Sequence, residues 1–257
     1  MTKSRLGLIA ILATLLQWTG CAGAADKILR LATLEWPPYV GSHLLHEGVT
    51  TYIVKNTAAQ IGYQVKNDYF PWSRAMQIGD NDPDFSGYFP TYFSTERNNQ
   101  CYLSNSLGNS SIGFAYLKST AFDWKEFPEL VQQQVRIGIV HNYQNGEAFD
   151  ALNRAKKLNT DVAPSDISNL RKLLAHRVQV AVIDKAVLRH LLATEPSLKP
   201  SQEQILFHDK ELASLSLHIC FHRNPEGRLM QAEFNAALSK LNLPRLENLY
   251  FSELEGK

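Results

Sequence analysis

Strand-like and helix-like hydrophobic patterns alternate along the first part of the chain. Residues 28–33 form a short apolar run of the kind found in buried strands, and apolar positions recur at helical spacing over residues 49–61. A second strand is predicted over residues 63–70. It is followed by a short helix over residues 72–78, which Gly79 is expected to end.

The same alternation continues after a strand at residues 112–117 and a linker-like stretch at residues 118–128. Continuous or alternating apolar runs predict strands here, and amphipathic runs predict helices. The predicted strands cover residues 135–140, 178–183 and 212–221, with a weak one at Val162, and the predicted helices cover residues 146–157, 166–176, 185–193 and 226–241.

The order of these elements predicts an α/β fold. Strands that alternate with helices are typical of parallel sheets covered by helices. One compact unit follows the linker-like stretch, and we expect the last strand and helix to return to the first unit. The predicted organisation is therefore two lobes, the first built from residues 26–118 and 210–257 and the second from residues 119–209.

The first 25 residues have the pattern of a signal peptide. A positively charged start, with Lys3 and Arg5, is followed by an apolar run over residues 6–16 and then by small residues. This run is short for a membrane span, although a retained anchor is an alternative. Cys21 could instead accept a lipid, but Trp18 stands where such signals usually carry leucine. We predict export to the periplasm.

Composition and charge exclude some classes of partner. The chain of 257 residues is 44% hydrophobic, which is enough for one large or two modest cores. Its 26 lysines and arginines face 25 acidic residues, for a formal net charge of +1. A chain so close to neutral has no strong field to attract nucleic acid or an anionic membrane, so we expect no nucleic-acid partner.

Two cysteines remain in the chain if export removes Cys21. Cys101 and Cys220 would then form an even pair in an oxidising compartment, which favours a disulfide. Two separate buried thiols are the alternative.

Polar and aromatic residues gather where the predicted strands end. Open α/β sheets place ligands at the carboxyl ends of their strands, where loops and helix amino termini offer free N–H groups. Residues suited to ligand contact directly follow the predicted strands: Glu35, Trp36 and Tyr39, then Tyr88 to Arg97 after a further strand expected near Phe85, then His141 to Gln144, and Asp184. Two lobes that face each other with these ends would form a ligand cleft.

Short motifs follow one another in a definite order along the mature chain. They are Leu31-Ala32-Thr33 with Trp36-Pro37-Pro38-Tyr39, Pro71-Trp72-Ser73-Arg74-Ala75, Thr95-Glu96-Arg97, Ile137-Gly138-Ile139-Val140 and Val180-Ala181-Val182-Ile183-Asp184. This ordered set resembles the family 3 extracellular solute-binding proteins, which are periplasmic binding proteins for polar amino acids. The resemblance covers nearly all of the mature chain. It implies a type II fold of two lobes around a ligand cleft, with no cofactor and no metal.

The resemblance also implies roles for single residues. Arg97 matches the arginine that binds the ligand's α-carboxylate, a task that suits the two parallel donors of a guanidinium. Asp184 matches the aspartate that receives the α-ammonium, so the two charges are expected to face one gap from opposite lobes. The implied ligand-binding set is Trp36, Tyr39, Trp72, Tyr88, Tyr92, Arg97, Tyr143 and Asp184.

Each of these residues also has a purely structural interpretation. Arg97 could lie at a solvated helix start, Asp184 could be a helix N-cap, and the tryptophans Trp36 and Trp72 could belong to the core.

Two departures from the family pattern add bulk to the expected cleft. Phe89-Pro90-Thr91-Tyr92 stands where the family has small hydroxyl residues, and Asn142-Tyr143-Gln144 stands where it has a small pair. The expected ligand classes therefore include amino acids, modified amino acids, small peptides, amines and other small acids.

Two other classes of function compete with solute binding. An enzyme similar to the related cyclohexadienyl dehydratases could use Glu35, His141 and Asp184 for proton transfer. Metal capture could use the histidine pairs at positions 43 and 46 or 218 and 222, but the sequence offers no evident third ligand. We predict a monomeric binding protein that is not an enzyme and that serves an ABC permease or a membrane sensor.

Overall fold

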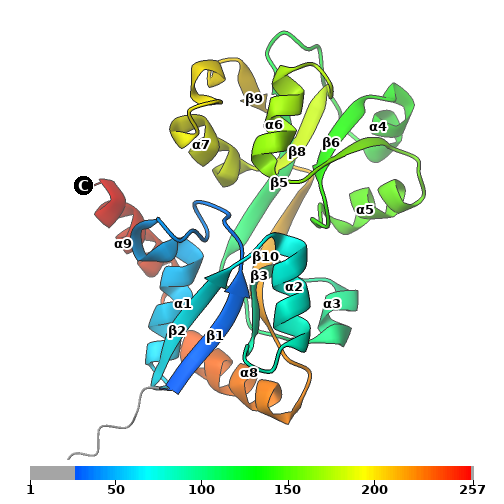
Figure 1. Ribbon diagram of the computed structural model, residues 1–257. Coiled ribbons are helices and arrows are strands. Elements are labelled where there is room, and N and C mark those ends of the chain that lie inside the picture. Colours follow the sequence, from blue (N-terminus) through cyan, green and yellow to red (C-terminus); the bar gives the residue numbers. More distant parts are fainter. Residues whose placement is uncertain (1–26, 256–257) are drawn as a thin grey trace, which may run out of the picture.

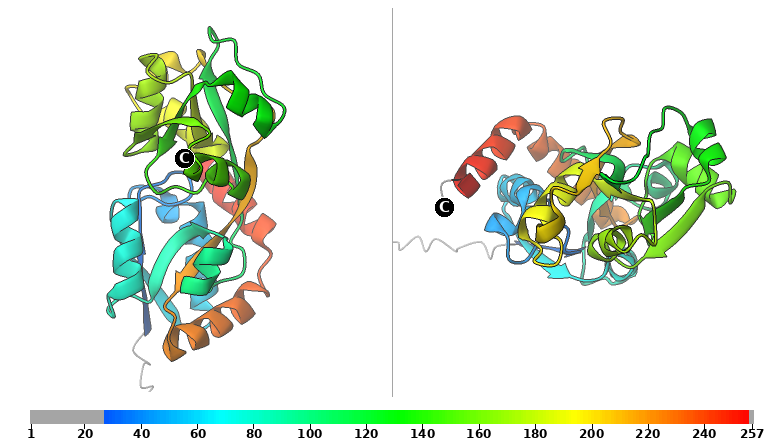
Figure 2. Two further views of the ribbon diagram at one scale, coloured as in Figure 1. Left: turned by 90° about the vertical axis from the view of Figure 1, so that its right-hand side faces the viewer. Right: turned by 90° about the horizontal axis from the view of Figure 1, so that it is seen from above.

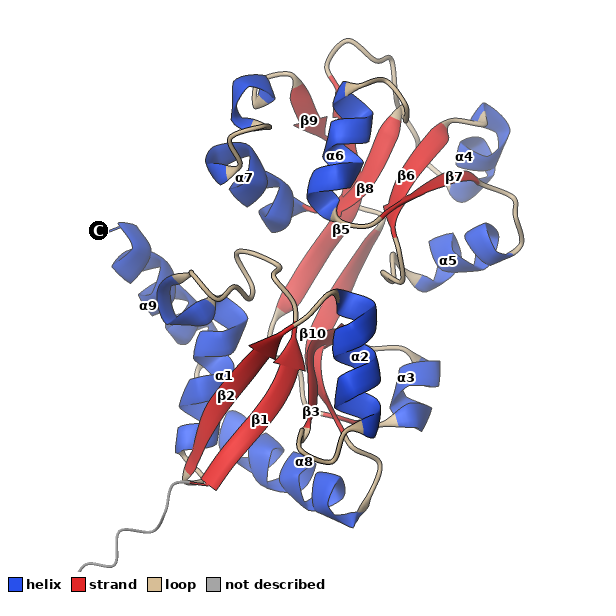
Figure 3. Ribbon diagram, in the orientation of Figure 1, coloured by secondary structure: helices blue, strands red, loops and turns tan. Residues whose placement is uncertain are grey.

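The strands fall into two groups, which form the two lobes of the molecule (Figure 1). The computed structural model describes residues 27–255, so the predicted signal peptide at residues 1–25, with Cys21, lies outside the described residues. Within the described range, no helix has the length and hydrophobicity needed to cross a membrane. Helices flank the strands in both lobes (Figure 3). The predicted α/β class and the two-lobed organisation are confirmed.

The first lobe is built on parallel strands whose central member is β1 (Lys27–Thr33). Within β1, Leu29 and Leu31 are buried while Arg30 pairs with Asp68 on the neighbouring strand, as expected for a side chain period of two. The remaining elements are β2 (Tyr63–Tyr69), β3 (Gly87–Tyr92), β4 (Tyr102–Leu103), a 3-10 turn (Leu45–Glu47), α1 (Val49–Ala59), α2 (Trp72–Asn81), α3 (Thr95–Gln100), α8 (Pro225–Leu238) and α9 (Leu243–Glu255).

The second lobe is centred on β8 (Val180–Asp184), which is buried along its whole length between β5 (Asn109–Leu117) and β6 (Arg136–Val140). This position explains the continuous apolar run of its sequence. The other elements are β7 (Asn159–Ala163), β9 (Ile205–Phe207), a 3-10 turn (Lys199–Ser201), α4 (Phe127–Gln133), α5 (Glu147–Arg154), α6 (Asp166–Leu174) and α7 (Lys185–Thr194).

Strand β10 (Ala213–Phe221) belongs to both lobes. Its residues 213–216 pair with β5, and the residues from Leu217 onward pair with β3. The side view in Figure 2 shows this strand running from one lobe to the other. The strand order is β2-β1-β3-β10-β5-β8-β6-β7, with β4 on β10 and β9 on β5. The predicted lobe boundaries near residues 118 and 210 stay a prediction.

Two expectations about local structure were wrong. Helix α2 continues past Gly79 to Asn81. Gly79 packs against Tyr88, and a Cβ atom there would come within 2.6 Å of the tyrosine Cβ, so the glycine serves close packing and does not end the helix. The stretch predicted as a linker contains Phe122 and Trp124, which are buried against Phe114 in the core of the second lobe. The pattern there was too irregular to predict burial.

Cys101 and Cys220 are joined by a disulfide with a Cα–Cα distance of 5.5 Å. Cys101 is the C-cap of α3, and Cys220 lies on β10. The bond therefore attaches the end of α3 to the strand that connects the lobes.

Candidate functional site

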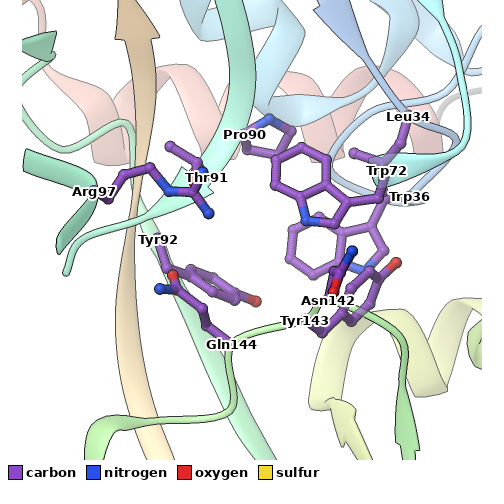
Figure 4. Close-up of a pocket in the computed structure, with 10 residues that line it drawn as sticks. All are labelled: Leu34, Trp36, Trp72, Pro90, Thr91, Tyr92, Arg97, Asn142, Tyr143 and Gln144. Carbon is purple, nitrogen blue, oxygen red and sulfur yellow. The ribbon is translucent and has the colours of Figure 1, made fainter. Parts of the chain in front are cut away.

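A small cavity lies between the lobes, at the carboxyl ends of β1, β3 and β6. Residues of the first lobe form one side of it, and the loop after β6 forms the other (Figure 4). Its free space is small, about 30 Å³. The lining residues are Leu34, Trp36, Trp72, Pro90, Thr91, Tyr92, Arg97, Asn142, Tyr143 and Gln144.

The turn after β1 places Trp36 in this cavity. The Val40 amide donates to the Trp36 carbonyl oxygen, and the Trp36 amide donates to the Val40 carbonyl oxygen, so the chain folds back on itself. This brings the Trp36 ring onto the Tyr39 ring, with centroids 4.5 Å apart and planes inclined by 25°. Trp36 lies on the cavity side of this pair, while Tyr39 does not line the cavity.

Arg97 lies in the first turn of α3, and hydrogen bonds hold both its backbone and its side chain. Ser94 caps the helix by accepting a hydrogen bond from the Arg97 amide at 3.1 Å. The Nη1 group donates to the hydroxyl of Tyr88 and approaches the sulfur of Met76 at 3.3 Å. Tyr88 is fully buried, so its ring and hydroxyl form a rigid support below the guanidinium. Figure 4 shows the Arg97 side chain directed toward Thr91 and the indole rings.

Asp184 is placed differently from the sequence expectation. It is 3% exposed and does not line the cavity. Its Oδ1 atom accepts the amides of Ala186 and Val187 as the N-cap of α7, at 2.7 and 2.9 Å. Its Oδ2 atom accepts hydrogen bonds from the hydroxyls of Ser110 and Tyr39, at 2.6 and 3.0 Å.

The expectation that Asp184 and Arg97 face one gap is therefore corrected. The physical reason is that Tyr39, from the Trp36-to-Tyr39 motif, donates its hydroxyl to Asp184, while Tyr92, from the first departure from the family pattern, lines the cavity itself. The Tyr92 hydroxyl lies 2.7 Å from that of Ser110, which itself donates to Asp184.

The sequence analysis missed Asp166, a second carboxyl group behind the cavity. It is the first residue of α6 and is 7% exposed. The side chains of Trp36 and Tyr143 lie close to it. Burial, and then the nearby charge of Asp184, raise the pKa of Asp166 to about 7, against the smaller lowering effects of these two side chains. Its position at the start of a helix could be predicted from the sequence, but its neighbours could not, because they come from distant loops.

Polar contacts close the loop after β6 over the first lobe. The side-chain amide of Asn142 donates to the Ser73 hydroxyl at 2.8 Å, and the side-chain amide of Gln144 donates to the Ser94 hydroxyl at 3.1 Å. These contacts hold the loop against the first lobe, and a movement of the loop away from Ser73 and Ser94 would widen the cavity.

Two wider grooves flank the cavity. One of about 820 Å³ includes Glu35, Trp72 and His141, and the other of about 690 Å³ includes Asp80 and Arg97. Glu35 accepts hydrogen bonds from the amide and hydroxyl of Ser42.

Two of the four histidines considered for metal binding have other partners. His46 pairs with Glu253 at 2.8 Å, and His218 contacts the Ser216 hydroxyl and the Ser104 carbonyl oxygen, each at 2.7 Å. Among residues 27–255 the structure contains no cluster of three or more His, Cys, Asp or Glu side chains that could hold a metal ion.

The structure thus divides the predicted ligand set. Trp36, Trp72, Tyr92, Arg97 and Tyr143 meet at the cavity. The other three predicted residues support them from behind and are Tyr39, Tyr88 and Asp184.

Solved structures show which known proteins share this arrangement. The ligand-binding core of GluR0 from Nostoc punctiforme, in complex with L-glutamate, superposes with a TM-score of 0.67 at 18% identity over 88% of this chain and 98% of that chain. An ancestral arginine-binding protein bound to arginine gives a TM-score of 0.71 at 13% identity over 88% and 97%. The chain has the fold of the two-lobed amino-acid-binding proteins.

The resemblance seen in the motifs is thereby confirmed at the level of the fold. An ancestral amino acid-binding protein described as a precursor of cyclohexadienyl dehydratase has the same fold, with a TM-score of 0.69 at 13% identity over 88% of this chain and 94% of that chain. No protein-family model and no curated protein matches the sequence. At these low identities the likeness carries the fold and leaves the function to be argued from the site.

Proposed function

We propose that the protein is an exported solute-binding protein that captures a small, amino-acid-like solute between its lobes. The supporting observation is Arg97, a half-buried guanidinium that lines an aromatic cavity at the junction of two lobes. Cavities at such junctions are the usual ligand sites of two-lobed α/β proteins. The amino-acid-binding proteins of the same fold support this assignment.

Capture proceeds by opening and closing of the lobes. The loop from Asn142 to Gln144 leaves Ser73 and Ser94 to admit the solute, and closure then brings Tyr143 and the polar loop side chains onto it. Closure is favoured when the solute contacts both sides of the cleft, because it then binds the closed state better than the open one. The protein acts as a periplasmic monomer and presents the closed form to an ABC permease or a membrane sensor.

A thermal-shift screen of amino acids, amines and small carboxylic acids tests this proposal. A true ligand at 100 times its dissociation constant stabilises the protein by about 2.7 kcal/mol. We expect a concentration-dependent rise of the melting temperature with at least one carboxylate. If no compound of the three classes raises it, the proposed function is wrong.

Catalysis is the second candidate, because Glu35 and His141 line the same groove beside the cavity. Binding is preferred, since Asp184, the third group considered for proton transfer, is held by four internal hydrogen bonds. Incubation with prephenate or arogenate separates the two functions. Product formed at a rate that depends on protein concentration would favour the enzyme.

A further inference from the structure

The cavity between the lobes carries one charged side chain, and that side chain is a cation. Of the ten lining residues only Arg97 is charged, and none is a carboxylate. Arg97 forms no ion pair with the residues described by the structure, and there its Nε and Nη2 groups find no hydrogen-bond acceptor. Guanidinium donors that are free and partly shielded from solvent can form two parallel hydrogen bonds to a planar oxyanion such as a carboxylate.

The nearby carboxyl groups are already occupied. Asp184 accepts four hydrogen bonds, and Asp166 is buried beside Trp36 and Tyr143. Both lie behind the aromatic wall and neither lines the cavity. The acidic residues Asp80, Glu96 and Asp150 line the adjoining groove, which Arg97 also lines, but none of them lines the cavity itself.

The walls of the cavity favour a flat apolar body. Four of the ten lining side chains are aromatic, namely Trp36, Trp72, Tyr92 and Tyr143, and Leu34 and Pro90 add aliphatic surface. The Trp36 and Tyr92 rings meet edge to face, with centroids 6.1 Å apart. Aromatic side chains of this kind can stack on a planar group of the solute, and an apolar lining favours an apolar solute body.

We propose that the solute is a carboxylate with a flat apolar body and without an ammonium group, the class represented by 3-phenylpropionate. This inference rests on the proposed function and narrows its ligand. An α-ammonium placed in the cavity would lose water, find no carboxylate and lie near the positive charge of Arg97. An unpaired buried charge of this kind costs several kcal/mol, so the amino acid binds more weakly than its deaminated counterpart.

Isothermal titration calorimetry with a matched set of three probes tests the inference on the exported chain. 3-Phenylpropionate, L-phenylalanine and phenethylamine share one aromatic body and differ in their charged groups. We expect 3-phenylpropionate to bind at least about tenfold more tightly than L-phenylalanine, and phenethylamine not to bind.

Two outcomes would overturn the inference in different ways. If L-phenylalanine, phenethylamine or another amino acid of the screen binds as tightly as 3-phenylpropionate or more tightly, the ligand class is wrong and the proposed function stands. If neither the matched set nor any compound of the screen binds, the proposed function fails as well.

The Asp184→Asn variant provides a second test, because asparagine keeps an acceptor for the amides at the start of α7. We expect its affinity for 3-phenylpropionate to stay within about threefold of the wild-type value. L-Phenylalanine binding that is present in the wild type and lost in Asp184→Asn, while 3-phenylpropionate binding is kept, would place an ammonium at Asp184 and contradict the inference.

Discussion

The two charged residues expected to hold a ligand occupy opposite environments. Arg97 lines the cavity between the lobes and keeps donors without a partner among the described residues. Asp184 lies behind aromatic side chains and accepts four hydrogen bonds from its own chain. Arg97 therefore has donors available for a ligand, whereas all hydrogen bonds of Asp184 named above are made within the protein.

This difference shows that a charged residue near the junction of the lobes can serve either stability or binding. A carboxylate that caps a helix and accepts buried hydroxyls contributes to stability, because each donor would otherwise be left unpaired. A guanidinium held on one side by Tyr88 and open on the other is free to bind a solute, as the proposed function requires. Variants that affect stability and affinity separately will test this division.

Removal of the disulfide should give the largest loss of stability. The bond closes a loop over a sequence separation of 119, and Cys101 lies at the end of the Arg97 helix. Replacement of both Cys101 and Cys220 by serine should lower the free energy of unfolding by about 5 kcal/mol in the chain-entropy model. Urea denaturation measures this loss, and dithiothreitol should reproduce it in the wild type. Equal stability of both forms would contradict it.

The Asp184→Ala substitution should give the next largest loss. It removes the N-cap of α7 and leaves the buried hydroxyls of Ser110 and Tyr39 without their acceptor. We expect the free energy of unfolding to fall by about 3 kcal/mol, with a smaller loss for Asp184→Asn. A loss below 1 kcal/mol for Asp184→Ala in chemical denaturation would show that its carboxylate is not the structural group described above.

Asp166 should make stability depend on pH. Its pKa rises from 3.8 to about 7 in the folded protein, so between these values the folded chain holds a proton that the unfolded chain has lost. The free energy of unfolding should therefore fall as pH rises from about 4 to 7, by up to about 1.4 kcal/mol per pH unit, and then level off.

The Asp166→Asn variant is the control for this profile, because it removes the titrating group and keeps a polar side chain of the same shape. Denaturation curves at several pH values should show a flatter profile for the variant. An unchanged slope would assign the pH dependence to other carboxyl groups, such as Asp184.

The Ser94→Ala substitution should have the smallest effect. It removes the cap of α3 and the contact of that hydroxyl with Gln144. The expected loss of stability is about 1 kcal/mol, and the Ser94→Thr variant should recover most of it because threonine is also a good N-cap. Thermal denaturation of the three proteins measures this effect, and equal melting temperatures would contradict the capping role.

Much of the fold could be predicted from the sequence, because most strands and helices have regular apolar periods. The burial of Phe122 and Trp124 could not, since it depends on packing against Phe114 and not on a local period. In the site, Arg97 was found from its motif. The occupation of Asp184 was missed because Tyr39 and Ser110 reach it from positions 145 and 74 residues away.

The most direct test of the central claim is the affinity of 3-phenylpropionate for the Arg97→Ala protein, measured by calorimetry beside Arg74→Ala. Arg74 is an exposed arginine of α2 that does not line the cavity, so its loss makes the same change of charge. We predict an affinity about 30-fold weaker for Arg97→Ala, from the loss of about 2 kcal/mol of charge-assisted hydrogen bonding, and a change within twofold for Arg74→Ala. An unchanged affinity in a folded Arg97→Ala protein would contradict the claim that this guanidinium binds the solute.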